Sequence, residues 1–502
     1  MTAWLDRLTG RVTMYRLVVI VLGAIAAIAI VLSLIPGGLS FSPLQLLATL
    51  ATSLVVTYLS NRLIALPFRV KPHSESSIIT ALLLFFLFFP TTDPHDLLVL
   101  ALVAVIASAS KYVLAIRGRH LFNPAAVAAL IIAFTQLSAA VWWVGTPLLL
   151  APVAIGAFLV VYRVRRFALV GLFVVVALAI SIVRLSTGGM DVGTAVWFSI
   201  ASSPILFMAG FMLDEPLTLP PLRWQQLTIA AVAAVIVEVP FHLGPLYNSP
   251  ELGLVVGNLI AFFFGQRRAV RLDFVGSSAM TPSTRELRFA PSRPVAFRAG
   301  QYLEFTLPHR GADTRGIRRT FSIASAPHEG QLAFGLTVPP DASSFKRALL
   351  VLEPGDRLLA TSVGGDFLLP RDPSVPLLLV AGGIGITPFI SQLRHLGATG
   401  QRRDIVLVYA VSGLDELAYS EELAASGIRV LVVAPSEPPA APEGWLYLGA
   451  TRLTGSRIAE AVPDLAARTA YVSGPPALVT ALKRDLRRLG VRRIRADYFS
   501  GY

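Results

Sequence analysis

Long apolar runs separated by short polar segments occupy the chain up to about residue 265. Each run has, or nearly has, the ~20 residues that a helix needs to cross a hydrocarbon core of ~30 Å. The pattern predicts ten spans, at about 14–35, 43–64, 76–90, 96–112, 122–137, 144–162, 166–184, 193–213, 225–241 and 251–265. The first run predicts a membrane helix and not a removable signal, because further spans follow it and no small-residue cleavage site ends it.

After residue 268 the apolar runs shorten and charges become frequent, which predicts a different architecture. Segments such as RELRFA, QYLEFTL, RTFSIAS and LAFGLTV predict short strands over 270–372, with the spacing of a small antiparallel barrel. Over 373–502, apolar strands such as PLLLVAG and DIVLVYAV alternate with helical stretches, which predicts a parallel α/β sheet. The predicted domains are therefore 1–265, 270–372 and 373–502.

Composition supports a lipid-facing part. Of 502 residues, 54% are hydrophobic and only 15% are charged, against about 25% charged in ordinary soluble proteins. Cysteine is absent, which excludes disulfides, cysteine-ligated iron–sulfur clusters and thiol nucleophiles supplied by this chain. The net charge of +13 is explained by basic loops beside membrane spans, so no nucleic-acid partner is predicted.

The basic residues of the membrane part gather in alternate loops. They are Arg7, Arg11, Arg16, Arg62, Arg69, Lys71, Lys111, Arg117, Arg119, Arg163, Arg165, Arg166, Arg223, Arg267, Arg268 and Arg271. The intervening loops hold almost no basic residues, and they contain Asp93, Asp96, Asp191 and Glu251. Positive-inside bias then predicts a multi-pass protein of the inner membrane, with the lipid bilayer as a partner. It places both termini and residues 270–502 on the cytoplasmic side.

Two phrases recur between the halves of the membrane part. FFPTTDP (88–94) is matched by FMLDEPLTLPP (211–221), and FNPAAVAALIIAF (122–134) by NSPELGLVVGNLIAF (248–262). Because the matched phrases lie five spans apart, and so on opposite sides of the membrane, they predict an inverted repeat. Proline and asparagine at these span ends predict broken helices that face protein or a cofactor cavity.

A glycine-rich turn, AGGIGITPF (381–389), follows the first strand of the predicted α/β sheet. Its glycines would let the backbone approach a pyrophosphate, and the following helix would direct its first amides at the charge. A turn that only packs the helix on the strand is the alternative. RRTFS (318–322) precedes this turn and SGPPAL (473–478) follows it. Together, in this order, the three motifs resemble the ferredoxin–NADP reductase superfamily over residues 270–502.

This resemblance implies bound FAD. Arg319 would contact the FAD phosphates, Thr320 belongs to the same motif, Phe321 would lie along the isoalloxazine, and Ser322 would lie at its N5 edge. DASSFKRALLVLEPGDRL resembles a second pyrophosphate segment, which implies FAD contacts for Ser343 and Ser344. An ordinary N-cap serine is the alternative for either residue.

The resemblance also implies a nicotinamide nucleotide site. It implies pyrophosphate contacts for Gly383, Gly385, Thr387 and Pro388, a position beside the nicotinamide for Ser473, Gly474 and Pro475, and a position near the flavin for Asp497 and Phe499. Ser322, Ser473 and Asp497 are its candidate catalytic residues. The acidic residues after the second strand would repel the 2′-phosphate of NADPH and so favour NADH; they are Asp415, Glu416, Glu421 and Glu422.

SESSIITALLLFFLFFP, SKYVLAIRGRHLFNPAA and AGFMLDEPLTLPP carry a second resemblance, over residues 10–265. They resemble the NqrB/RnfD membrane family, which occurs in Rnf complexes and in the sodium-translocating NADH:quinone reductase. That resemblance implies a membrane flavin, FMN or riboflavin, and partner subunits that would supply any iron–sulfur relay. The Ser-Gly-Ala-Thr motif for covalent FMN is absent; in the nearest stretch, STGGMDVGTA, Thr187 or Thr194 would carry the flavin, and an uncharged polar loop is the alternative.

The two resemblances favour an enzyme that moves electrons from NAD(P)H to FAD, then through a membrane flavin to an extracytoplasmic flavoprotein or similar acceptor. A quinone reductase confined to the cytoplasmic leaflet is one alternative. The other is a redox-coupled ion transporter, with Glu238 as a mid-span carboxylate on the ion path. For Glu238, a helix-end residue that faces headgroups is the alternative. His73, His95, His120 and His242 lie near span ends on two sides, which argues against a bis-histidine haem, and no metal site is predicted.

Overall fold

In the computed structural model, the described residues are 12–499, except 69, 71, 117–118, 245, 266–268, 314–315, 362, 438–441 and 451. The basic residues of the predicted topology that fall outside this set are Arg7, Arg11, Arg69, Lys71, Arg117, Arg267 and Arg268. The chain forms two compact units, one ending at Arg267 and the other beginning at Arg268.

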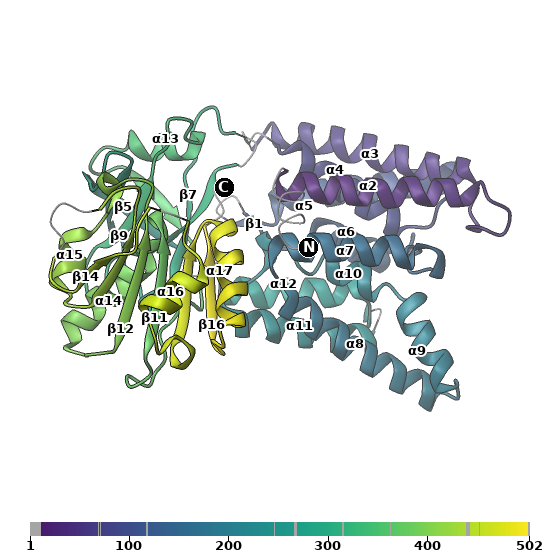
Figure 1. Ribbon diagram of the computed structural model, residues 1–502. Coiled ribbons are helices and arrows are strands. Elements are labelled where there is room, and N and C mark those ends of the chain that lie inside the picture. The colour runs from purple at the N-terminus through teal and green to yellow at the C-terminus, as the bar shows by residue number, and fades with distance from the viewer. Residues whose placement is uncertain are drawn as a thin grey trace. The chain divides into compact units, whose positions relative to one another are not determined.

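The first unit is helical (Figure 1), and a helical segment coincides with each predicted span. The helices are α2 Met14–Ser33, α3 Pro43–Ala65, α4 Ser74–Leu87, α5 Pro94–Val113, α6 Pro124–Thr135, α7 Leu150–Val164 (preceded by η1 Pro147–Leu149), α8 Phe167–Thr187, α9 Val192–Ala201, α10 Ile205–Phe211, α11 Arg223–Glu238 and α12 Pro250–Phe264. Among the described residues, six segments are long and apolar enough to cross a membrane, whereas α4, α6 and α12 are apolar but shorter. The full count of ten spans stays a prediction.

Side-chain caps determine where several of these helices begin. Ser42, Asp93, Asn123 and Ser249 each accept a hydrogen bond from a first-turn amide, and each is followed by a proline in the first turn. A proline is suited to that position because the first-turn amide has no partner within the helix. At 93–94 and 123–124 the proline and asparagine therefore start helices, and the prediction that they break helices there is wrong. A break does occur at residues 202–204, between α9 and α10.

The packing of helices in the first half recurs in the second. α3 packs on α4 and α5, α5 on α6, and α2 on α4. In the second half, α8 packs on α9, α10 and α11, α11 on α12, and α7 on α10. A small hairpin follows the corresponding helix in each half: β1 Ala115–Ile116 with β2 Arg119–His120 after α5, and β3 His242–Leu243 with β4 Leu246–Tyr247 after α11.

The second unit begins with an antiparallel sheet in the order β8-β7-β10-β5-β6-β9. Its strands are β5 Val270–Ala279, β6 Thr284–Pro291, β7 Tyr302–Thr306, β8 Arg318–Ser322, β9 Leu332–Thr337 and β10 Arg357–Ala360, and helix α13 is Ser344–Leu350. A bridge between Ile323 and Phe334 joins the two edges of the sheet, β8 and β9. Phe289, Phe305 and Phe334 fill the interior, as expected for a small barrel whose inward positions alternate along each strand.

A parallel sheet follows, in the order β14-β13-β12-β11-β15-β16. Its elements are β11 Leu377–Gly382, η4 Gly383–Ile386, α14 Thr387–Thr399, β12 Ile405–Ala410, η5 Leu414–Glu416, α15 Ser420–Ala425, β13 Arg429–Val433, β14 Trp445–Tyr447, α16 Gly455–Ala461, η6 Leu465–Ala467, β15 Thr469–Gly474, α17 Pro476–Arg488 and β16 Ile494–Tyr498. Apolar clusters cover both faces of this sheet. The carboxyl ends of β11 and β15 therefore meet at one edge, where ligands bind in open α/β sheets.

Candidate functional site

The glycine-rich turn lies at the carboxyl end of β11, where η4 leads into α14. Gly383 has φ of +52°, a conformation that glycine adopts without steric cost. A Cβ on Gly385 would lie 2.5 Å from the carbonyl oxygen of Ser473. Thr387 is buried, and its hydroxyl donates to the carbonyl of Ile384 at 3.0 Å, while Pro388 stands in the first turn of α14. The turn thus exposes backbone where a side chain would not fit.

The second nucleotide motif lies directly beside this turn. β15 pairs with β11 so that Ser473 is opposite Ala381, and a Cβ on Gly382 would lie 3.1 Å from Cδ of Pro475. Gly474 has φ of +148°. The structure therefore brings together Gly383, Gly385, Thr387, Pro388, Ser473, Gly474 and Pro475, which the sequence motifs assign to one nucleotide site.

Ser473 and Asp497 are register partners on the neighbouring strands β15 and β16. The Ser473 side chain is fully buried, and its hydroxyl has no hydrogen-bond partner among the described residues. Phe499 follows β16 and donates its amide to the carbonyl of Gly474 at 2.9 Å. Burial raises the pKa of the Asp497 carboxyl to about 6. Part of the population therefore holds a neutral carboxyl, able to donate a hydrogen bond, at mildly acidic pH.

Asp497→Asn is expected to remove a pH dependence of stability between about pH 4 and pH 6. The folded state binds the Asp497 proton more tightly than the unfolded chain does, so the contribution of this group falls as pH rises through that window. Thermal melts of the full chain and of Asp497→Asn across this range measure the difference. If the two melting temperatures differ by the same amount at every pH, the pKa of Asp497 is not raised by folding.

The flavin motif lies on β8, which pairs with β7 so that Arg319 is opposite Phe305 and Ser322 opposite Tyr302. Arg319 is buried, and its guanidinium donates to the carbonyls of Gly316 and Arg318. The Phe321 ring lies nearly parallel to the Phe345 ring, with centroids 6.1 Å apart and 25° between the planes. Ser322 is buried and Thr320 is exposed.

The loop between β7 and β8 connects Arg319 to the second phosphate segment. Asp313 lies 3.4 Å from Arg319 through one carboxylate oxygen and accepts the amide of Ser344 at 3.1 Å through the other. The Ser344 hydroxyl accepts the amide of Asp313 at 2.9 Å and lies 3.0 Å from Nε2 of His309. Ser343 is the N-cap of α13 and accepts the amide of Lys346. Asp313 and His309 were not predicted, because no motif marks contacts between residues so distant along the chain.

Two of the acidic residues that favour NADH have structural partners. Glu416 accepts hydrogen bonds from Thr281 at 2.6 Å and Ser283 at 2.7 Å, and Glu422 forms a bidentate pair with Arg394. Both contacts neutralise or occupy the carboxylate. Of the four acids, only Asp415 and Glu421 therefore remain predicted to repel a 2′-phosphate.

The membrane-unit candidates have local helix-end roles. Thr187 is the last residue of α8, exposed, and donates to the carbonyls of Val183 and Arg184. Thr194, also exposed, bonds Asp191, the N-cap of α9. Glu238 is the last residue of α11 and lies 3.6 Å from Arg184. The structure therefore favours the helix-end alternative for Glu238, because α11 ends there and an arginine faces the carboxylate.

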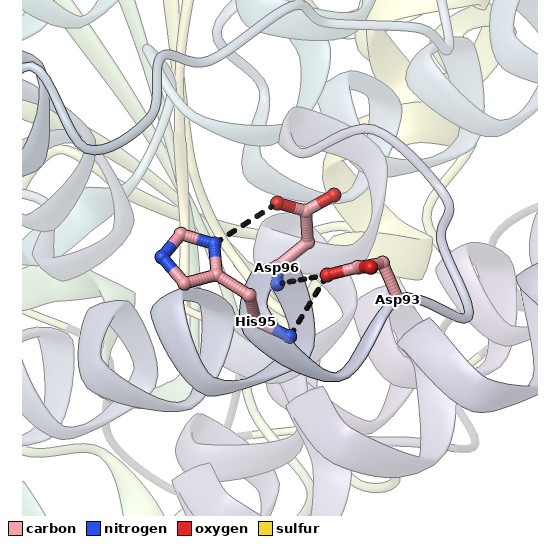
Figure 2. Close-up of side chains that lie close together, drawn as sticks. All are labelled: Asp93, His95 and Asp96. Atoms are coloured by element: carbon pink, nitrogen blue, oxygen red, sulfur yellow. Dashed lines mark hydrogen bonds and ion pairs between the residues drawn. The ribbon is translucent and has the colours of Figure 1, made fainter.

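Asp93, His95 and Asp96 place chelating atoms close together at the start of α5 (Figure 2). Asp93 accepts the amides of His95 and Asp96 as the N-cap of the helix. All three side chains are exposed. Helix capping accounts for the arrangement, so it is no evidence for a metal site.

Comparisons with known proteins concern the second unit. The family model described as an oxidoreductase NAD-binding domain matches residues 379–484. The reductase subunit of an aromatic O-demethylase from Amycolatopsis is 32% identical over 231 residues, which cover 43% of this chain and 65% of that subunit, slightly less than two thirds. Ferredoxin–NADP reductase B from Sorangium cellulosum is 33% identical over 205 residues, covering 39% of this chain and 79% of the relative.

Among solved structures, a ferredoxin NADP⁺ reductase from Neisseria gonorrhoeae with bound FAD and NADP is 20% identical, with a TM-score of 0.39. The match covers 46% of this chain and 99% of that one.

Proposed function

Since this chain belongs, through its C-terminal half, to the ferredoxin–NADP reductase family, we propose that it passes electrons from NAD(P)H into a membrane. It is an FAD-dependent NAD(P)H oxidoreductase. The observation that carries the proposal is the presence, on one chain, of this reductase and of a unit whose described residues include six helical segments long and apolar enough to span a bilayer.

The predicted FAD residues and the predicted nucleotide residues fit the chemistry of their cofactors. We propose 270–372 as the FAD domain and 373–502 as the nucleotide domain, after a membrane domain over 1–265. FAD, when bound, accepts hydride from the nicotinamide and releases electrons one at a time. Arg319 supplies a buried cation for the FAD phosphates, with Thr320 beside it on β8 and Ser343 and Ser344 at the second phosphate segment. Phe321 would present a ring face to the isoalloxazine.

The nucleotide half orients the other cofactor. The backbone around Gly383 and Gly385, with the first turn of α14 at Thr387 and Pro388, would take the pyrophosphate. The buried hydroxyl of Ser473, next to Gly474 and Pro475, would orient the nicotinamide. Ser322, Asp497 and Phe499 would border the flavin, with Asp497 able to hold a proton near pH 6.

We propose that the membrane unit is an inverted repeat of ten spans that resembles the NqrB/RnfD family. The recurring helix packing and the paired hairpins support this proposal. A bilayer core of ~30 Å is too thick for one electron transfer step, so the unit requires a carrier of its own. We propose FMN or riboflavin, bound without covalent attachment, because Thr187 and Thr194 are exposed and the threonine motif is absent.

The electron acceptor is then an extracytoplasmic flavoprotein or similar carrier. Positive-inside bias supports a cytoplasmic reductase in the inner membrane, which requires the electrons to cross the bilayer to reach such an acceptor. The Arg184 partner of Glu238 gives no support to an ion path through that residue.

Flavin analysis of the detergent-purified chain tests the proposal. We expect FAD and a second flavin, and bleaching of the FAD by NADH or NADPH. Arg319→Ala should release FAD and retain the second flavin, because only the reductase unit loses its phosphate cation. Arg285→Gln, an exposed barrel arginine, is the control and should retain both. FAD as the sole flavin of the wild-type chain would favour quinone reduction in the cytoplasmic leaflet, and failure of both nucleotides to bleach it would contradict the nicotinamide site.

A further inference from the structure

The C-terminal end of the reductase unit carries a dense set of exposed arginines. We define the α17 basic patch as Arg484, Arg487, Arg488, Arg492, Arg493 and Arg495, all exposed. They come from the last turns of α17, the turn after it and β16. No salt bridge is found for Arg487, Arg488, Arg492 or Arg493 within the described part of the chain, whereas Arg484 approaches Asp485 at 3.8 Å.

A groove opens beside the patch. It has a volume of about 560 Å³ and is lined by Val375, Pro376, Thr469, Arg492 and Arg493, together with the segment 466–468 and Gly490. Arg468 in this lining is already paired with Asp404 and Asp464. Arg492 and Arg493, which have no ion-pair partner among the described residues, thus supply the positive charge of a concave surface large enough for a phosphate-bearing headgroup.

The position of the patch excludes the cofactors as its ligands. Pro376 and Thr469 stand at the amino ends of β11 and β15, whereas the nucleotide turn lies at their carboxyl ends. Strands of this length separate the two edges by about 17 Å.

We propose that the α17 basic patch binds anionic phospholipid headgroups of the cytoplasmic leaflet. Clusters of arginines near a membrane anchor are attracted by the negative surface potential of that leaflet. Residues 265–269 join α12, which ends at Phe264, to β5, which begins at Val270, so the unit that carries the patch is tethered to the membrane unit by a short connection. An extended segment of that length reaches only about 20 Å. Leu489, exposed in the middle of the patch, supplies an apolar tip suited to the headgroup boundary. The inference rests on the cytoplasmic placement of residues 270–502 in the proposed function.

The absence of cysteine from the chain allows a site-specific test. Leu489→Cys is labelled with a fluorophore in the full chain, reconstituted in nanodiscs that carry a headgroup-quencher lipid. The discs contain phosphatidylcholine alone or with phosphatidylglycerol. We expect quenching at position 489 to rise at least twofold with phosphatidylglycerol. At about 1 M salt, where the Debye length is about 3 Å, the rise should disappear.

Matched variants separate lipid binding from simple proximity. Arg487→Gln with Arg488→Gln should abolish the rise, whereas Arg285→Gln with Arg298→Gln, exposed arginines of the barrel, should leave it. A label at Ser277→Cys, on β5, should show no rise.

Flavin content and NADH bleaching should be the same in all variants, which separates this proposal from the enzymatic one. Equal quenching with and without phosphatidylglycerol, or a rise that survives loss of both arginines, would overturn the proposal; the first of these would leave an acidic protein as the partner to seek.

Discussion

Arg394→Ala is expected to lower the free energy of unfolding of the reductase unit by about 3–5 kcal/mol, the usual cost of breaking a buried ion pair. Arg394, on α14, forms a bidentate pair with Glu422 at 2.8 and 2.6 Å and lies 3.2 Å from Glu286 of β6. Glu286 is 1% exposed, so the substitution leaves a buried carboxylate that has lost Arg394 at one oxygen and keeps Arg288 at the other. Arg394 also donates to the carbonyl of Ala324, and thereby holds the barrel to the α/β domain.

The loss should appear as a fall of about 10 °C in the temperature at which FAD is released, since each kcal/mol shifts the melting temperature of a domain of this size by roughly 2–4 °C. Arg402→Ala is the control, because that arginine is exposed in the loop after α14 and should change little. Equal melting temperatures for Arg394→Ala and the control would show that the pair contributes nothing to stability.

Gly385→Ala is expected to slow the reduction of FAD by NADH about a hundredfold, the effect that a displacement near 1 Å can have on a reacting pair. The new methyl group would lie 2.5 Å from the carbonyl oxygen and 2.7 Å from the carbonyl carbon of Ser473. Both are backbone atoms, so the turn or the end of β15 must move. FAD should remain bound, because Arg319 is on another domain.

Anaerobic stopped-flow bleaching of the flavin measures this rate. Gly397→Ala is a matched control within α14, where a Cβ meets no atom within 4 Å and alanine is favoured in a helix. We expect it to keep the wild-type rate. A wild-type rate in Gly385→Ala as well would mean that the nicotinamide does not bind over this turn.

The sequence predicted a helix or strand wherever a local pattern of apolar residues determines it. Apolar runs locate the helices of the first unit because a helix satisfies its backbone groups internally, whichever neighbours it acquires. The break at residues 202–204 falls on Ser202, Ser203 and Pro204. A proline removes an amide donor and breaks a helix, a local signal that the count of apolar runs did not use. The two alternatives for Glu238 could not be separated from the sequence, because hydrophobicity continues past the point where α11 ends.

Within the candidate site, the sequence predicted those residues whose type is determined by the local backbone conformation. Gly385 belongs to a turn where a side chain would clash, and the sequence motif records that requirement. Asp313 bonds Ser344 and Arg394 pairs with Glu286, partners distant along the chain, and any exposed loop or helix could carry the same residue types. The same reason explains the reassignment of Glu416, whose hydroxyl partners on the barrel become neighbours only through folding.

The short connection between Phe264 and Val270 has a kinetic consequence under the proposed electron route. Two separate proteins would exchange electrons at a rate that depends on the abundance of both. Units on one chain meet at an effective concentration of the order of millimolar, set by the connection. Electron delivery is then unimolecular, so each molecule turns over at the same pace whether the membrane is crowded with copies or nearly empty.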